Sequence, residues 1–191
     1  MPSNIILLGD PASGKATQGK FLAKKYKLYD LDMGRILREI KEGTHHSEYS
    51  TELIATMDQG HLAPTAIVRA LLEENIAKAS PIHGILFNGT PKMTGEARLV
   101  QKWLRQYRSN HDATVVYLHL PVAESLKRML KRARADDSKA ALANRIKYYR
   151  KHISAVVALL KLHYKFIIID GSGTRTQVRA RIVKKLHGSI Y

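Results

Sequence analysis

The residues with the clearest chemical meaning lie near the start of the chain, where glycines and a lysine follow an apolar run. Residues 9–15 have the pattern G-x-x-x-x-G-K, and a helix-like pattern follows directly. Glycines at such a turn let backbone N–H groups converge on phosphate oxygens, while the helix N-terminus and a lysine attract the negative charge. The candidate phosphate-binding residues are Gly9, Pro11, Ala12, Ser13, Gly14, Lys15, Ala16 and Thr17.

One feature of this turn departs from the usual pattern, and one other interpretation of the turn is possible. Position 16 is Ala, where many such loops have a metal-binding hydroxyl, and the hydroxyl comes one residue later at Thr17. The plain alternative is a glycine-rich turn from a strand into a helix that binds no ligand. The full spacing and the sequence on both sides favour phosphate binding.

The elements that must position this turn follow from the hydrophobic pattern. Short aliphatic or β-branched runs predict buried strands at residues 4–8, 84–87, 114–118 and 166–169, with a weaker strand at 28–31. Helical spacing occupies residues 17–26, 95–107, 122–132, 140–162 and 175–186. This alternation predicts an α/β fold in which helices cover a parallel sheet. Ligands of such sheets bind beyond the carboxyl ends of the strands, so Gly9, Asn88 and residues 170–173 are expected to meet.

Length, composition and charge narrow the class of protein. At 191 residues, with 45% hydrophobic and 25% charged residues, we expect one globular domain. The absence of Cys excludes disulfides and thiolate chemistry and is compatible with a cytoplasmic location. We expect no export signal, no membrane segment and a monomer. The net charge of +16 favours polyanionic partners such as nucleotides or nucleic acid, although a basic solvated surface explains it equally well.

Segments in the same order along most of the chain resemble the adenylate kinase family of P-loop nucleoside monophosphate kinases. Residues 9–18 are similar to its G-x-P-G-x-G-K-G-T-Q loop. Residues 33–38, 57–64 and 88–92 resemble T-G-D-x-L-R, M-D-x-G-x-L-V-P and D-G-F-P-R. Residues 134–137 and 145–149 resemble the R-x-D-D and R-L-x-x-Y segments beside the lid, and residues 170–171 match the loop at the donor adenine.

The resemblance implies a fold and its subdivisions. The fold is a P-loop NTPase-type three-layer sandwich with a five-stranded parallel sheet, formed as a single kinase domain over residues 1–191. A small helical insertion that binds the nucleoside monophosphate is expected at residues 33–66, and a minimal lid loop at residues 132–137. Only three residues separate Arg132 from Asp136, which leaves no room for a long lid.

The resemblance also implies an activity and the residues that perform it. The reaction is reversible transfer of the γ-phosphoryl group from Mg²⁺-bound ATP to a nucleoside monophosphate, most simply ATP and AMP giving two ADP. Lys15 would hold donor phosphates, Arg38 and Lys92 the acceptor phosphate, and Arg132, Arg134 and Arg145 the transferred group. Asp136 and Asp137 would orient these arginines. Further nucleotide-binding positions implied by the family are Gly34, Gly60, Ala63, Gly89, Glu96, Arg128 and Gly173.

Several residues depart from the family pattern. Asn88 replaces an Asp that orders metal-bound water, and Lys92 replaces an Arg whose planar fork grips phosphate. Met33 and Arg35 replace a Thr and an Asp. Glu96 replaces the Gln that reads the acceptor base. An ionised carboxylate pairs better with the N1–H and amino groups of guanine than with adenine, so GMP is the alternative acceptor. Glu96 could instead face solvent at the start of a helix, where an acid is favoured.

These departures support a rival function from another class. The altered residues and the charge of +16 suit a kinase-fold protein that binds nucleotides or RNA with weak or no kinase activity. A small-molecule kinase of the shikimate or gluconate type would share the loop but not the other segments. Any one of the arginines near the lid also fits a solvated surface. His45 and His46 lack the spacing of a metal site, so no metal is assigned to the protein's own side chains.

Overall fold

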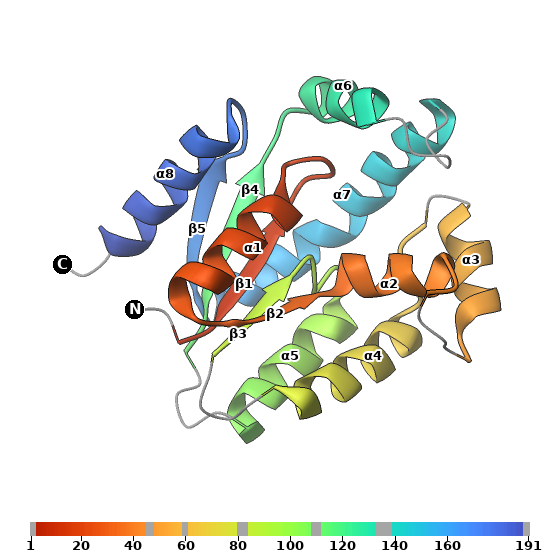
Figure 1. Ribbon diagram of the computed structural model, residues 1–191, viewed down its shortest axis with the longest axis horizontal. Helices are drawn as coiled ribbons and strands as arrows, with labels where there is room; N and C mark the ends of the chain where they lie inside the picture. The colour runs from red at the N-terminus through yellow and green to blue at the C-terminus, as the bar shows by residue number, and fades with distance from the viewer. Residues whose placement is uncertain are drawn as a thin grey trace.

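A sheet of five parallel strands forms the centre of the molecule (Figure 1). The computed structural model describes residues 3–44, 48–58, 61–79, 84–107, 112–132 and 139–188. The strand order is β2-β3-β1-β4-β5, which places β1 in the middle. The strands are β1 (Ile5–Gly9), β2 (Tyr29–Asp32), β3 (Ile85–Asn88), β4 (Thr114–His119) and β5 (Lys165–Asp170). The predicted α/β fold with a five-stranded parallel sheet is confirmed.

Burial explains why the central strands give a clear signal in the sequence and β2 gives a weak one. Every residue of β1 and β3 is buried, and both strands are apolar until their last residues. Parallel strands that are covered on both faces have this composition. β2 lies at an edge of the sheet and carries Asp30 and Asp32. These two carboxylates interrupt its apolar run and weaken the pattern.

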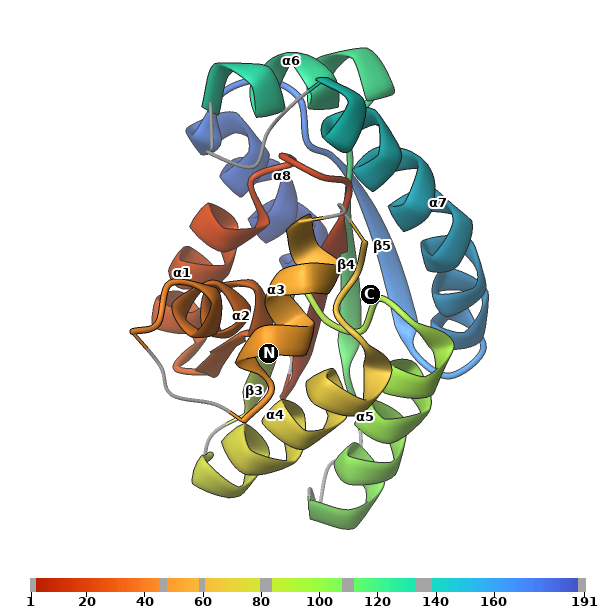
Figure 2. The same ribbon diagram turned by 90° about the vertical axis from the view of Figure 1, so that its right-hand side faces the viewer.

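Helices cover both faces of the sheet, as Figure 2 shows. On one face, α1 (Lys15–Tyr26) and α8 (Arg175–His187) bury residues such as Leu22 and Ile182 against the strands. On the other face, α4 (Thr65–Lys78), α5 (Thr94–Tyr107) and α7 (Lys139–Lys161) surround a larger apolar cluster. α6 (Val122–Arg132) follows β4 at the carboxyl edge of the sheet. Among the described residues, no helix combines the length and the apolar character needed to cross a bilayer.

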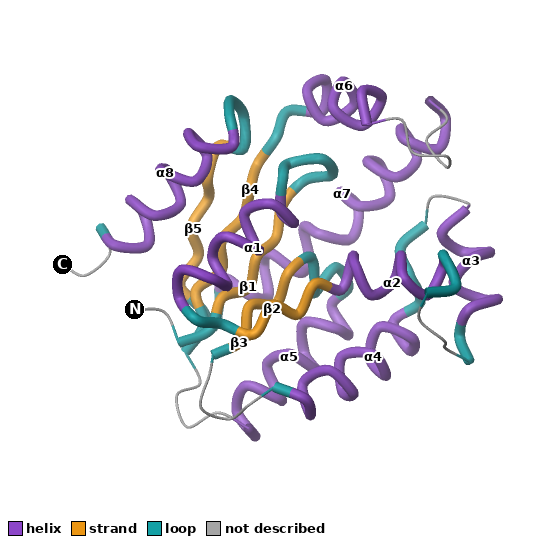
Figure 3. Tube along the Cα trace, viewed as in Figure 1, coloured by secondary structure: helices purple, strands orange, loops and turns teal. Residues whose placement is uncertain are grey.

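Two helices between β2 and α4 occupy the region of the expected insertion. α2 (Met33–Lys41) begins directly after β2, and its N-cap Asp32 accepts a hydrogen bond from the Arg35 N–H at 2.9 Å. α3 (Ser50–Asp58) contacts α2, and Figure 3 shows it at the end of α2 that is farther from the sheet. The boundaries of this unit at residues 33 and 66 stay a prediction.

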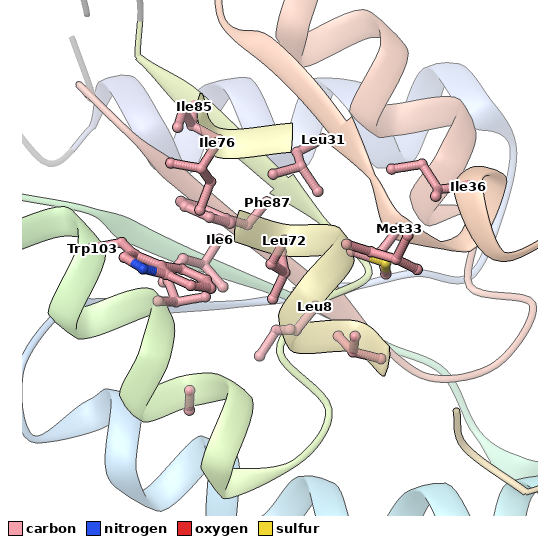
Figure 4. Packing of buried hydrophobic residues seen from close by; sticks show 14 of the residues in the cluster. Ile6, Leu8, Leu31, Met33, Ile36, Leu72, Ile76, Ile85, Phe87 and Trp103 are labelled. Carbon is pink, nitrogen blue, oxygen red and sulfur yellow. The ribbon is translucent and has the colours of Figure 1, made fainter. Parts of the chain in front are cut away.

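The larger core is centred on Phe87 of β3. Figure 4 shows this ring beside Ile6, Leu72 and Ile76, with Trp103 and Met33 farther out in the same cluster. Trp103 is 6% exposed and packs in this core. Met33 is 1% exposed and packs in the core rather than facing an acceptor nucleotide. The first residue of α2 therefore anchors the insertion to the sheet.

Replacement of Phe87 by Ala should lower the free energy of unfolding by about 3–5 kcal/mol, because the variant loses a buried ring and gains a cavity. Phe87 is 1% exposed. Urea unfolding measures the effect. In the control Ile168→Ala, the side chain lost from edge strand β5 is 58% exposed, and we expect a change of about 1 kcal/mol or less. Similar losses in the two variants would contradict this description of the core.

Candidate active site

The phosphate loop, defined here as residues 9–15, leads from β1 into α1 through a tight turn. A Cβ on Gly9 would lie 2.6 Å from the carbonyl oxygen of Leu118 on β4, so only glycine fits. The N–H of Asp10 donates to that same carbonyl at 3.0 Å. Gly14, with φ of 89°, supplies the left-handed conformation directly before α1. The helix therefore begins at Lys15, earlier than the predicted residue 17.

The Lys15 side chain lies across the phosphate loop. Its Nζ donates to the carbonyl oxygens of Gly9 at 2.5 Å and Asp10 at 2.8 Å. The same atom is 6.0 Å from the ring centroid of Tyr149 on α7. The ammonium group is thus held at the loop, where the terminal phosphates of a nucleotide would meet it.

A cleft of about 720 Å³ lies beyond the carboxyl ends of the strands, where ligands of open α/β sheets bind. Its volume is in the range of small-molecule binding sites. The phosphate loop and the start of α1 form one wall, and α2 with the segment before α4 forms another. The predicted site residues that line it are Pro11, Ala12, Ser13, Gly14, Lys15, Ala16, Thr17, Gly34, Arg38, Ala63, Gly89, Lys92 and Arg128.

The wall opposite the phosphate loop combines positive charge with apolar surface. Arg38 and Lys92, both predicted, are joined there by Lys41. Lys41 was not among the site residues predicted from the sequence. It follows Arg38 by three positions on α2 and therefore shares its helix face. The apolar part consists of Leu37, Met57, Leu62 and Ala63. Such a wall can hold an anion beside a flat apolar group.

Asn88, at the end of β3, is buried at the edge of the cleft. Its Nδ2 donates to Oδ1 of Asp30 at 3.1 Å. The side chain also lies against Gly19 of α1, where an added Cβ would be 2.1 Å from Nδ2. Burial raises the pKa of Asp30, the hydrogen bond from Asn88 lowers it, and the nearby charge of Asp32 raises it further. Asn88 thus compensates a half-buried carboxylate on the neighbouring strand.

The oxygen atoms at this end of the cleft suit a Mg²⁺ ion that arrives with a nucleotide. Thr17, Asp32 and Asn88 all line the cleft and offer hydroxyl, carboxylate and amide oxygens. Mg²⁺ usually keeps several waters and is bound through few protein groups together with substrate phosphates. Within the part of the chain that the structure describes, no cluster of three His, Asp or Glu side chains could hold a metal by itself.

Glu96 is placed differently from both sequence-based expectations. It is 2% exposed, so the expected position in solvent is wrong. Its Oε2 accepts hydrogen bonds from the Lys92 N–H at 2.7 Å and from Thr90 Oγ1 at 3.1 Å. Glu96 is absent from the cleft lining, so the structure lends no support to a contact with the acceptor base. Its carboxylate instead ties the start of α5 to the loop after β3.

Arg128 lies at the cleft, but its guanidinium group is engaged with protein atoms. Its Nε donates to Glu124 at 2.7 Å, Nη1 to the Gly171 carbonyl at 3.1 Å and Nη2 to the Gly173 carbonyl at 3.4 Å. The side chain therefore joins α6 to the loop after β5. Gly173 does not line the cleft and contributes to the site only through this loop.

Several predicted site residues cannot be placed in this way. Gly60, Arg134, Asp136 and Asp137 lie outside the described residues, as do most of the predicted lid and the pair His45 and His46. The backbones of Arg132 and Arg145 belong to α6 and α7, respectively, whereas their side chains are not described. The roles given to these residues stay predictions.

Comparison with known proteins agrees with this geometry. The family model for adenylate kinase matches residues 7–165. A protein named Adenylate kinase from Flavobacterium johnsoniae is 32% identical over 185 residues, or 94% of this chain and 95% of that protein. Proteins of the same name from Azobacteroides pseudotrichonymphae and Mycobacterium ulcerans are 31% and 28% identical, over 96% and 95% of this chain and 96% and 98% of the relatives. The family match includes the residues of the phosphate loop and of α2.

Replacement of Glu96 by Gln tests the burial of this carboxylate. Burial raises the pKa of Glu96 above its usual value of 4.5. Between pH 4.5 and the raised pKa of Glu96, the native state binds more protons than the unfolded state. The contribution of Glu96 to the free energy of unfolding therefore falls as the pH rises. We expect the unfolding free energy of the wild type, relative to Glu96→Gln, to decline as the pH rises from about 4.5 through the raised pKa of Glu96.

Urea unfolding across this pH range provides the measurement. Glu52→Gln removes an exposed carboxylate from α3 and serves as the control for the loss of one negative charge. A difference between wild type and Glu96→Gln that grows with pH would contradict the assigned burial.

Proposed function

Since the chain belongs to the adenylate kinase family and is a nucleoside monophosphate kinase, we propose that it transfers the γ-phosphoryl group of ATP to AMP, giving two ADP. The observation that supports this assignment is the single cleft that joins the phosphate loop to Arg38, Lys41 and Lys92. Phosphoryl transfer needs little covalent chemistry from the protein, so positioning and charge neutralisation can supply the catalysis.

On the donor side, we assign the β- and γ-phosphates of ATP to the phosphate loop. The N–H groups at the start of α1 face an anion favourably, and the helix dipole adds to this attraction. Lys15 would exchange its carbonyl partners, Gly9 and Asp10, for phosphate oxygens. A hydrogen bond between charged groups is stronger than one to a neutral carbonyl, which favours this exchange.

On the acceptor side, Arg38 and Lys92 would hold the monophosphate, with Lys41 as a third cation. The base would lie against the apolar lining from Leu37, Met57 and Leu62. AMP is favoured by the family, and GMP is the alternative acceptor. Guanine is the less favoured base, because the carboxylate of Glu96 already accepts hydrogen bonds from Lys92 and Thr90.

We propose that Mg²⁺ enters with ATP and that arginines near the lid complete the site. Thr17, Asp32 and Asn88 would help to hold the ion, which would neutralise part of the charge on the phosphates. Arg132, Arg134 and Arg145 would stabilise the charge that spreads over the transferred group. The short lid at residues 132–137 would place Arg132 and Arg134 there, and α7 would place Arg145.

We also propose that the enzyme acts as a monomer in the cytoplasm. One chain supplies both the phosphate loop and the opposing cations of the cleft. The absence of Cys is compatible with a reducing compartment.

Lys15→Met should lower kcat by about a hundredfold or more, because one positive charge at the transferring phosphoryl group is lost. Circular dichroism and thermal unfolding should stay close to those of the wild type. The matched control is Lys20→Met, an exposed lysine on the same helix, which should retain normal turnover. A coupled assay of ATP with AMP, GMP, CMP and UMP measures both variants. Normal turnover by Lys15→Met would contradict the donor assignment.

A second function, binding of nucleic acid, is supported by the distribution of charge. α1 and α8 together contain nine Lys and Arg and no Asp or Glu. The two helices lie side by side, since the Tyr26 hydroxyl is 3.3 Å from Nε2 of His187 and the Arg179 guanidinium carbon is 4.1 Å from the Phe21 ring centroid. We propose that this basic face attracts the phosphates of single-stranded RNA in addition to the kinase activity.

Charge reversal tests this face. The variant with Lys20, Lys24, Arg175 and Lys184 changed to Glu should bind single-stranded RNA more weakly and with a shallower salt dependence, by about three units in the slope of log K against log salt. The control reverses the same number of exposed cations on α5 and α7, namely Arg98, Lys102, Arg105 and Lys151. Fluorescence anisotropy at several salt concentrations gives the slopes. Equal losses of RNA affinity in both variants, or no RNA binding by the wild type, would contradict the proposal that this face binds RNA.

A further inference from the structure

Asp10, the second residue of the phosphate loop, carries a buried charge that the reaction as described does not use. Its side chain is 3% exposed. A carboxylate next to the site of a triphosphate repels it electrostatically, and burial strengthens such repulsion because water no longer screens the charges. A structural contribution of Asp10 must therefore offset this electrostatic repulsion.

The carboxylate of Asp10 is held by groups from two distant elements. Oδ2 accepts a hydrogen bond from the Leu120 N–H at 2.7 Å and lies 3.1 Å from Nδ1 of His119. Oδ1 accepts from the Tyr117 hydroxyl at 3.0 Å and lies 4.0 Å from Nε of Arg150. The partners come from the end of β4 and from α7, more than 100 residues away in the sequence.

Two tyrosines, the buried Tyr149 and the half-buried Tyr117, close this arrangement into a ring. The Tyr149 hydroxyl hydrogen-bonds both to the backbone of Gly9 and to Tyr117, whose own hydroxyl donates to Asp10. Burial raises the pKa of Tyr149 and of Tyr117, and the charge of Asp10 raises that of Tyr117 further. Both tyrosines therefore keep their protons and remain hydrogen-bond donors. The two ends of the ring, Gly9 and Asp10, are neighbours in the phosphate loop.

We propose that Asp10 is a positioning residue that fixes the phosphate loop to β4 and α7 through Tyr117 and Tyr149, so that the loop N–H groups face the donor phosphates. Tyr149 also lines the cleft and lies near Lys15, so the ring reaches the donor site itself. The Arg150 guanidinium, with Nε 4.0 Å from Oδ1, offsets part of the negative charge. This inference rests on the proposed binding of ATP at the phosphate loop.

Asp10→Asn is the sharpest test because it keeps the shape of the side chain. An amide has one acceptor oxygen, so its NH₂ group must face either the Leu120 N–H or the Tyr117 hydroxyl, both of which donate to Asp10. We expect KM for ATP to rise by about tenfold, which is the loss of one buried charge-assisted hydrogen bond, while KM for AMP changes by less than about twofold. If Asp10 had a purely structural role, the substitution would weaken the binding of both ATP and AMP or of neither.

A second variant separates the network from a folding defect. Tyr117→Phe removes the donor to Oδ1 and should also raise KM for ATP. In the double variant the effects should not add, because both substitutions act on the same hydrogen-bond network. The control Asp112→Asn changes an exposed carboxylate before β4 and should leave both KM values unchanged. Additive effects, or equal changes in KM for ATP and AMP, would overturn the proposal.

A measurement without turnover distinguishes this proposal from the function on which it rests. Tyrosinate absorbance in an alkaline titration should show the pKa of Tyr117 lowered in Asp10→Asn, with Tyr117→Phe identifying the transition. Calorimetric titration with ATP should show about tenfold weaker binding to Asp10→Asn than to the wild type. If Lys15→Met binds and turns over ATP normally, the donor assignment fails; if only the Asp10 variants behave as wild type, the positioning role fails.

Discussion

The turn from β1 into α1 is the constraint on which the whole site depends. Gly9 approaches the Leu118 carbonyl so closely that no side chain fits between them, and the next N–H donates to that carbonyl. Because β1 lies between β3 and β4, the turn comes within reach of both neighbouring strand ends. The position of the phosphate loop, of Asn88 and of Leu120 thus follows from one close contact between two strands.

The acidic residues around this turn are distributed in a way that accounts for one departure from the family pattern. Asp30 and Asp32 both belong to β2, and Asp30 receives a hydrogen bond from Asn88 at 3.1 Å. An Asp at position 88 would place a second carboxylate at that distance, and like charges so close cannot both ionise without a large cost. The amide at position 88 therefore fits the carboxylates of β2. The negative charge near the proposed Mg²⁺ position comes from Asp32 of the neighbouring strand.

Elements formed by local sequence patterns could be predicted, whereas contacts between distant segments could not. The strands and helices around the sheet follow from hydrophobic runs and helical spacing, and the phosphate loop follows from its glycines and Lys15. Glu96 is an exception, because its partners, the Lys92 N–H and the Thr90 hydroxyl, belong to the loop directly before α5, and residue spacing does not reveal the geometry of that loop. Lys41 was overlooked because only the shape of the cleft distinguishes it from other lysines on the surface.

The proposed acceptor side can tolerate altered residues if phosphate binding there depends on the number of positive charges and not on the planar shape of a guanidinium group. Met33 has become part of the core, and Arg35 pairs with Glu39 on an exposed turn of α2. Arg38, Lys41 and Lys92 remain on the cleft wall. Two of these are lysines, which attract phosphate as point charges and lack the planar fork that orients it. Orientation of the acceptor would then come from the apolar wall that we propose to contact its base, and rigid packing of α2 on the sheet would be part of the catalytic apparatus.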